Sequence, residues 1–187
     1  EESMRHLVYS SVKVSGGSNQ KIIISKPNRR TPYFGEDVFT DELRKLSDDY
    51  YEDVALLAFH TSPINDAVKD IDEKALYYRA PYSSMKDVKP FLAEPAKNIL
   101  SQNSGINKDQ IIDLTGLLQK DGTLNWQVPA GNWTIMRFGM RNNGAVTRPA
   151  PQPGLGFECD KFDTTALNNH FDNYVGKLIS KVNPKKA

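Results

Sequence analysis

The stretch that decides the fold spans residues 131–161 and has the sequence GNWTIMRFGMRNNGAVTRPAPQPGLGFECDK. Its first part alternates apolar side chains with period two, which is typical of a β-strand with one buried face. Trp133, Ile135 and Arg137 lie on one face of this predicted strand, which runs from 133 to 140. Its second part is a loop rich in Pro and Gly that ends in the acidic pair Glu158 and Asp160. This order predicts a long strand that leads into a stiff loop and then a helix.

Shorter β-patterns occur on the N-terminal side of this strand. Two strands joined by a Gly/Ser/Asn turn are expected at 6–14 and 21–25, and others at 111–114 and 124–128. Residues 53–61 are almost continuously apolar, as in a strand buried on both faces. The charged segment 37–51 predicts a short surface helix. Residues 62–107 are interrupted by prolines and are expected to be irregular.

In the C-terminal part of the chain, the spacing of apolar residues changes from that of a strand to that of a helix. Asp163 is expected to cap a helix that runs to about Ser180. One face of this helix is apolar and holds Leu167, Phe171, Tyr174, Val175 and Leu178. Strands followed by one helix predict a mainly β fold, an antiparallel β-sandwich of jelly-roll or galactose-binding-like type with a C-terminal amphipathic helix at 164–180. We place the sandwich at 1–150, with an irregular insertion at 62–107, and a loop and helix at 151–187.

Composition and motifs exclude several classes of protein. The formal net charge is +1, from 24 basic and 23 acidic residues, which gives no electrostatic drive toward nucleic acid or an anionic membrane. No apolar run approaches the roughly 18 residues of a membrane span. The single cysteine, Cys159, excludes an internal disulfide, and the three histidines lie far apart. The sequence therefore predicts no metal site, no cofactor, no nucleic-acid partner and no membrane partner. Residues 1–6 lack the features of a signal peptide. Since the chain nevertheless starts almost directly in strand-like sequence, we expect a piece of a longer protein whose targeting signal lies upstream.

Aromatic clusters are the first candidates for binding. Sugars stack on exposed rings and exchange hydrogen bonds with nearby polar groups. The cluster at 77–82 suits this chemistry and makes Tyr78 and Arg79 candidate sugar ligands, although such clusters also cover the edges of a sandwich. Trp126 and Trp133 alternate with aliphatic side chains and are expected in the core.

A second candidate site lies where the long strand ends. Glu158 and Asp160 share one side if their segment is extended, and paired carboxylates serve glycosidic acid/base chemistry or bind a cation. The alternative is that they cap the next helix or form salt bridges with it. A stiff loop that holds arginines beside carboxylates suits hydroxyl-rich ligands. We predict one polar surface made of Arg141, Asn142, Asn143, Arg148, Glu158 and Asp160.

Several segments resemble the α-L-rhamnosidase-like enzymes of glycoside hydrolase family 106. The matching segments are residues 6–10 with Gly16-Gly17, 53–59, 113–116, 121–135 and 156–161. The tract from Asp121 to Lys161 is the most specific, and residues 62–107 match no motif of the family. In such enzymes β-sandwich insertions accompany a catalytic barrel, and the whole protein is exported to break down polysaccharide.

The resemblance implies an internal fragment with a periplasmic or extracellular location. It would be a carbohydrate-binding or scaffolding domain that is inactive alone, followed by a remnant of an adjoining catalytic barrel. Its expected partners are a carbohydrate, such as a rhamnose-containing glycan, and the rest of the parent chain. The alternative is a purely structural insertion with no affinity for sugar. No catalytic residue is assigned, because most of the barrel would lie outside this sequence.

Overall fold

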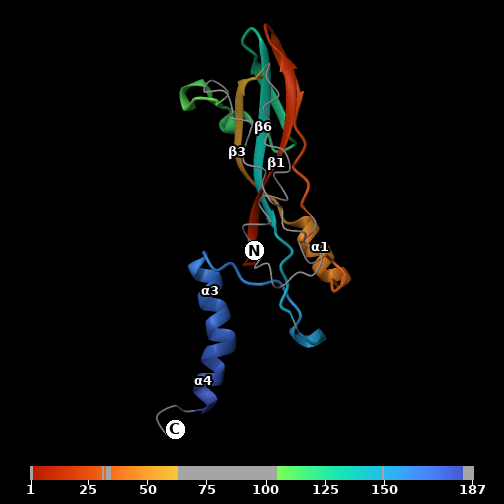
Figure 1. The fold of residues 1–187 in the computed structure, drawn as a ribbon, viewed down its shortest axis with the longest axis vertical. Helices are drawn as coiled ribbons and strands as arrows, with labels where there is room; N and C mark the ends of the chain where they lie inside the picture. The colour runs from red at the N-terminus through yellow and green to blue at the C-terminus, as the bar shows by residue number, and fades with distance from the viewer. Residues whose placement is uncertain (1, 31, 33–34, 63–104, 149, 183–187) are drawn as a thin grey trace, which may run out of the picture.

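The computed structural model describes residues 2–30, 32, 35–62, 105–148 and 150–182. They form two antiparallel sheets with a helical segment at the C-terminus (Figure 1). The larger sheet has the order β1-β6-β3-β4, with bounds Arg5–Ser15, Asn132–Asn142, Glu52–His60 and Ile112–Asp113. The smaller sheet pairs β2 (Asn19–Ile23) with β5 (Thr123–Gln127). The mainly β, two-sheet fold is confirmed, whereas its jelly-roll or galactose-binding-like topology and the proposed domain boundary stay predictions.

The predicted long strand is β6, which lies between β1 and β3. It pairs with β1 from Arg5↔Asn142 to Ser15↔Asn132, and with β3 from Glu52↔Met140 to His60↔Trp133. The register with β3 shifts between Asp53 and Ala55. Figure 1 shows these three strands running side by side along the long axis of the molecule. Strand β6 therefore runs from the middle of the core to the end of the sheet that lies beside the helix α1.

The first two strands belong to different sheets. β1 and β2 are joined by a turn at Gly16-Gly17, as predicted, but each pairs with a strand that lies far away in the sequence. The turn packs so tightly that a Cβ on Gly16 would lie 1.6 Å from the carbonyl oxygen of Pro129. Glycine is thus the residue that fits where the chain leaves one sheet for the other.

The core lies between the two sheets and is aliphatic apart from a tryptophan. Its buried members are Ile22, Ile24, Leu56, Ala58, Leu114, Leu124, Val128, Trp133 and Ile135. The ring of Trp126 packs edge-on against Trp133 with the centroids 5.5 Å apart, which confirms the expected place of both tryptophans. The prediction that β3 is buried on both faces was wrong, since Ala55, Leu57 and Phe59 are only half-buried on the outer face.

In the described part of the chain, one helix lies beside the end of the sheets and another follows them. α1 (Asp41–Asp49) is the predicted surface helix, with Thr40 as its N-cap. The other short helical turns are η2 (Lys108–Gln110), η3 (Thr115–Leu117) and η4 (Gln152–Gly154). The C-terminal helix comprises α3 (Thr164–His170), the π-helical turn η5 (Phe171–Gly176) and α4 (Lys177–Val182), so it ends two residues later than predicted. Across the described residues, no helix combines the length and apolar character that a membrane span needs.

The start of the C-terminal helix is fixed by its cap. The Asp163 carboxylate accepts hydrogen bonds from the backbone N–H groups of Thr165, at 2.9 Å, and Ala166, at 3.3 Å, as the sequence predicted. Figure 1 shows the helix beyond the end of the sheets and directed away from them. Its predicted apolar face is therefore largely exposed, instead of covering the sandwich.

Candidate functional site

A polar cavity lies where β6 ends beside α1. Its volume is about 520 Å³, and its lining residues are Asn28, Arg29, Glu36, Asp48 and Arg141. Arg141 is the next-to-last residue of β6, and Asp48 lies in the last turn of α1. The other lining residues come from the connection between β2 and α1, where the buried Pro27 stiffens the chain just before Asn28.

Ion pairs hold one wall of the cavity. The Arg29 guanidinium donates to Asp48 Oδ1 through Nε, at 2.5 Å, and to Glu36 through Nη1. Glu36 also accepts from Arg44 of α1, at 2.5 Å. The hydrogen bond from Arg29 lowers the pKa of Glu36, although its partial burial acts in the opposite direction. Glu36 is therefore ionised at neutral pH and available only as an acceptor.

Arg141 also lines the cavity and is held differently. Its Nε donates to the carbonyl of Pro27, at 3.2 Å, and its Nη1 donates to the carbonyls of Asp48 and Tyr50, both at 2.9 Å. The guanidinium carbon lies 4.8 Å from the centre of the Tyr51 ring. Within the described part of the chain, Arg141 has no carboxylate partner and its Nη2 forms no hydrogen bond. The cavity thus contains a positively charged donor that neutral carbonyl groups orient but do not neutralise.

An ion pair between a buried arginine and a partly exposed aspartate lies near Arg141 on the same strand. Arg137, four residues before Arg141 on the same face of β6, is 1% exposed and donates from Nε and Nη2 to the two Asp53 oxygens, at 2.7 Å each. Its Nη1 donates to the carbonyl of Ile24, at 2.6 Å. Arg137 thereby ties β6 both to β3 and to the end of the smaller sheet. The sequence placed Arg137 on the inner face but did not identify these partners.

Tyr51 links the buried pair to the cavity. Its hydroxyl donates to Asp53 Oδ1, at 2.6 Å, and its ring lies so close to Gly139 that a Cβ there would be 2.4 Å from the ring. Burial and the bond to Asp53 raise the pKa of Tyr51 to about 12. The hydrogen bond from Arg137 lowers the pKa of Asp53. The ring under Arg141 is therefore a neutral, fixed surface.

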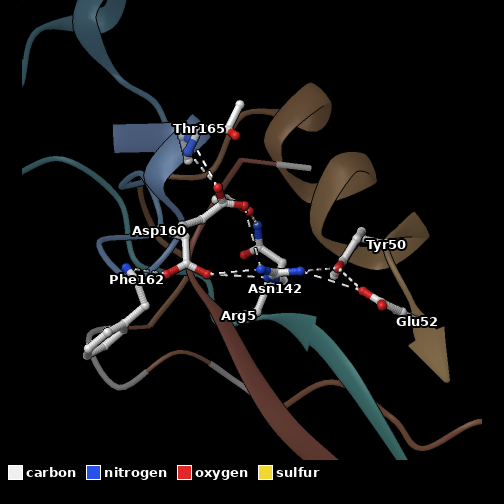
Figure 2. Close-up of polar contacts among 10 residues, drawn as sticks. Arg5, Tyr50, Glu52, Asn142, Asp160, Phe162 and Thr165 are labelled. Carbon is white, nitrogen blue, oxygen red and sulfur yellow. Dashed lines mark hydrogen bonds and ion pairs between the residues drawn. The ribbon is translucent and has the colours of Figure 1, made fainter. Parts of the chain in front are cut away.

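A second polar cluster joins the N-terminal strand to the start of the C-terminal helix (Figure 2). Arg5 of β1 donates from Nε and Nη2 to Asp160 Oδ2, both at 3.3 Å, and its Nη1 lies 3.6 Å from Glu52. The Tyr50 hydroxyl lies 3.5 Å from Nη1. Asp160 also accepts from the backbone N–H of Phe162, at 3.0 Å, which shapes the turn into the helix. Asp160 thus links β1 to the turn that precedes the C-terminal helix, and its predicted ligand role stays a prediction.

Four of the predicted site residues meet around the backbone of residues 2–4. The backbone N–H of Asn143 donates to the Met4 carbonyl at 2.9 Å, that of Met4 to Glu158 at 2.9 Å, and that of Asp160 to Glu2 at 2.8 Å. Asn142 is 1% exposed and bonds Ser3 through its side chain, at 2.6 Å. The structure thus brings Asn142, Asn143, Glu158 and Asp160 together, and their side chains shape the local loops.

The arginines of the predicted surface contact other groups. Arg141 faces the cavity, and Arg148 donates to Asp37 at 3.3 Å, whereas the Glu158 carboxylate pairs with Lys161 at 2.9 Å. Tyr78 and Arg79 lie outside the described residues, and a ligand role for the predicted surface stays a prediction. The sequence did not single out Asn28, Arg29, Glu36 or Asp48, because only the folded chain brings these dispersed residues together. Within the described ranges, no group of three or more His, Cys, Asp or Glu side chains is arranged to hold a metal ion.

The fold is an antiparallel double-sheet β-domain with a polar cavity beside the end of β6. The sequence matches the family Glyco_hydro_106, alpha-L-rhamnosidase, over residues 1–187, so the chain belongs to glycoside hydrolase family 106. It is similar in structure to a rhamnosidase from Novosphingobium sp. PP1Y, with a TM-score of 0.60 and 17% identity over 98% of this chain and 28% of that one. This likeness confirms the fold that the family resemblance implied.

A curated relative is similar in sequence over nearly the same length. It is the protein named "Putative beta-glucuronidase" of Formosa agariphila (strain DSM 15362 / KCTC 12365 / LMG 23005 / KMM 3901 / M-2Alg 35-1), which is 29% identical over 182 residues. The match covers 97% of this chain but 13% of the relative. The chain therefore spans only a small part of the length of the proteins that it matches.

Proposed function

We propose that this chain is a carbohydrate-binding domain of a rhamnosidase-like glycosidase, and that sugar binds in the cavity lined by Arg29 and Arg141. The observation that supports this most strongly is the state of Arg141, whose charge faces a polar cavity with a donor that no described residue uses. The exposed amide of Asn28 also forms no hydrogen bond in the described structure. Both groups can bond sugar hydroxyls without breaking an internal contact.

The dimensions and chemistry of the cavity fit one sugar unit. A volume of about 520 Å³ lies within the usual range for small-molecule sites. Glu36 and Asp48 can accept hydrogen bonds from hydroxyl groups, while Arg141 and Asn28 donate to hydroxyl oxygens. Carboxylates and donors in one cavity suit the hydroxyl groups of a pyranose ring, which both donate and accept hydrogen bonds. Rhamnose is the sugar that the family description suggests.

The cavity is suited to binding and not to hydrolysis. A glycosidic general acid is a carboxyl group whose pKa is raised, so that it is protonated when it acts. Arg29 has the opposite effect on Glu36, because its hydrogen bond lowers the pKa of this carboxyl group. We therefore propose that hydrolysis belongs to other parts of the parent enzyme. Export to the periplasm or the cell exterior is part of the same proposal, since that is where such an enzyme meets polysaccharide.

A second candidate function is a structural domain without affinity for sugar. Arg29, Glu36 and Asp48 already pair with one another, and every hydrogen bond of Arg141 holds a backbone carbonyl. The same residues could therefore serve only to fix the connection around α1. The two candidates differ in whether the unused groups of Asn28 and Arg141 contact a ligand.

Calorimetric titration with rhamnose-containing oligosaccharides separates these candidates. We expect weak, saturable binding, and we expect Asn28→Ala to weaken it by about 3–10-fold, the effect of losing one neutral hydrogen bond. The matched control is Asn125→Ala, which removes the same exposed amide from β5, outside the cavity, and should leave affinity unchanged. Absence of saturable heat at high sugar concentration would favour the structural role, and so would equal affinity of the wild type and Asn28→Ala.

A further inference from the structure

The C-terminal helix presents a continuous apolar stripe to solvent. The stripe consists of Leu167, Phe171, Tyr174, Leu178 and Val182, which are between 44% and 69% exposed. Their spacings of four, three, four and four residues are those of a single helix face, and the face extends across the π-helical turn. Soluble domains rarely expose a contiguous apolar face of this kind unless it is an interaction surface.

The helix is attached to the sandwich only through its first turns. Asp163 caps it, Ala166 is fully buried, and Asn169 Nδ2 donates to Glu2 Oε1 at 2.5 Å. The later side-chain hydrogen bonds of the described helix stay within it, from Asn173 to Asn169 and from Lys177 to Asn173. An isolated helix of this length is marginal in water, so most helices depend on the packing of an apolar face. Among the described residues, most of the apolar face of this helix is not packed against the sandwich.

The entry to the helix shows the same incomplete packing. Phe162 precedes the Asp163 cap and Leu167 follows at the fourth helical position, the two places that pack together in a hydrophobic staple. Here Phe162 is 96% exposed and Leu167 is 44% exposed, so Phe162 is uncovered and Leu167 is only partly covered. Meanwhile Asp160, held by Arg5, fixes the turn that directs the helix away from the sheets (Figure 2). The apolar stripe therefore has a set orientation relative to the sandwich and lacks a partner within the described residues.

We infer that this stripe, with Phe162, is a docking surface for another segment of the same longer polypeptide. The chain spans 28% of the rhamnosidase and 13% of the curated relative that it matches, so both proteins hold most of their residues outside the matched segment. A partner within one polypeptide has a fixed position relative to the sandwich, and the stripe has a fixed orientation that suits such a partner. The inference rests on family membership and not on sugar binding, so the two proposals can fail separately.

Hydroxyl-radical footprinting tests this inference on the polypeptide as the cell makes it, in comparison with the 187-residue chain. We expect labelling of Phe171 and Tyr174 to fall several-fold in the cellular polypeptide. Trp133, which is 4% exposed, should label slowly in both forms and serves as the control for an intact sandwich. In the cellular polypeptide, Leu178→Lys should restore the labelling of Tyr174 without changing that of Trp133.

Two results would overturn the inference. Equal labelling of Tyr174 in the two forms would show that no other segment covers the stripe. Protection of Tyr174 in the 187-residue chain alone, growing as its concentration rises from about 1 to about 100 µM, would identify a second copy as the occupant.

Discussion

Replacing Asp53 with alanine is expected to lower the free energy of unfolding by about 3 kcal/mol, because it leaves the buried Arg137 guanidinium without a carboxylate. The loss should lie at the lower end of the range for broken buried pairs, since the Asp53 side chain is 39% exposed and water can reach the vacated place. Urea unfolding followed by tryptophan fluorescence measures this loss, because Trp133 lies in the core.

The matched variant is Arg137→Met, which removes the buried charge and refills most of its volume. It should cost less than Asp53→Ala, because the remaining carboxylate is accessible to water. The stabilisation by this ion pair also depends on pH. Since the folded-state pKa of Asp53 is lowered, the pair stabilises the protein above the ordinary aspartate pKa of about 3.9, and this stabilisation is lost as the pH falls through the folded-state value. Asp53→Ala should flatten the loss of stability in that acid range, and an equal or larger cost for Arg137→Met would contradict the assignment.

Leu124→Ala is expected to destabilise the protein by about 2–5 kcal/mol, the usual cost of a large cavity in a packed core. Leu124 is fully buried on β5, in the smaller sheet, and packs among residues of both sheets. The variant therefore tests whether the two-stranded sheet shares one core with the larger sheet. Thermal or urea unfolding should show a single transition at a lower midpoint.

Leu46→Ala is the control for this substitution. Leu46 is 53% exposed on α1, and alanine favours a helix, so stability should change by less than about 0.5 kcal/mol. A second transition that appears only in Leu124→Ala would mean that the sheets unfold separately. That outcome would contradict the single core between them.

Local sequence patterns predicted much of the fold. The alternation from Trp133 to Met140 identified β6 and its inner face, and Asp163 correctly marked the start of the helix. Pairing between strands was harder to foresee, because β1 and β2 are adjacent in sequence yet join different sheets. That choice depends on contacts with β6 and β5, a hundred or more residues away. The apolar helix face was predicted, but periodicity does not tell whether the covering partner lies inside the same fold.

The candidate site was predictable only in part. Arg141 was expected to bind a ligand because it lies at the end of a long strand, and it does line the polar cavity. Arg29, Glu36 and Asp48 are ordinary surface charges in the sequence, and the packing of α1 against the end of β6 makes them neighbours. For Asp160, the sequence allowed either a ligand role or a structural role at the helix. Its contact with Arg5 could not be predicted, because Arg5 lies 155 residues away in the sequence.

The most direct test of the sugar-binding proposal follows the arginine side chains themselves by NMR. Titration of the labelled protein with L-rhamnose and a rhamnosyl disaccharide should shift the Nε–H signals of Arg29 and Arg141, which line the cavity. The signal of Arg137, buried beneath it, serves as the internal control and should stay in place. Saturable shifts at both cavity arginines are the predicted result. Unchanged signals at saturating sugar, or shifts confined to Arg5 and Arg148 at the other polar contacts, would contradict the proposed site.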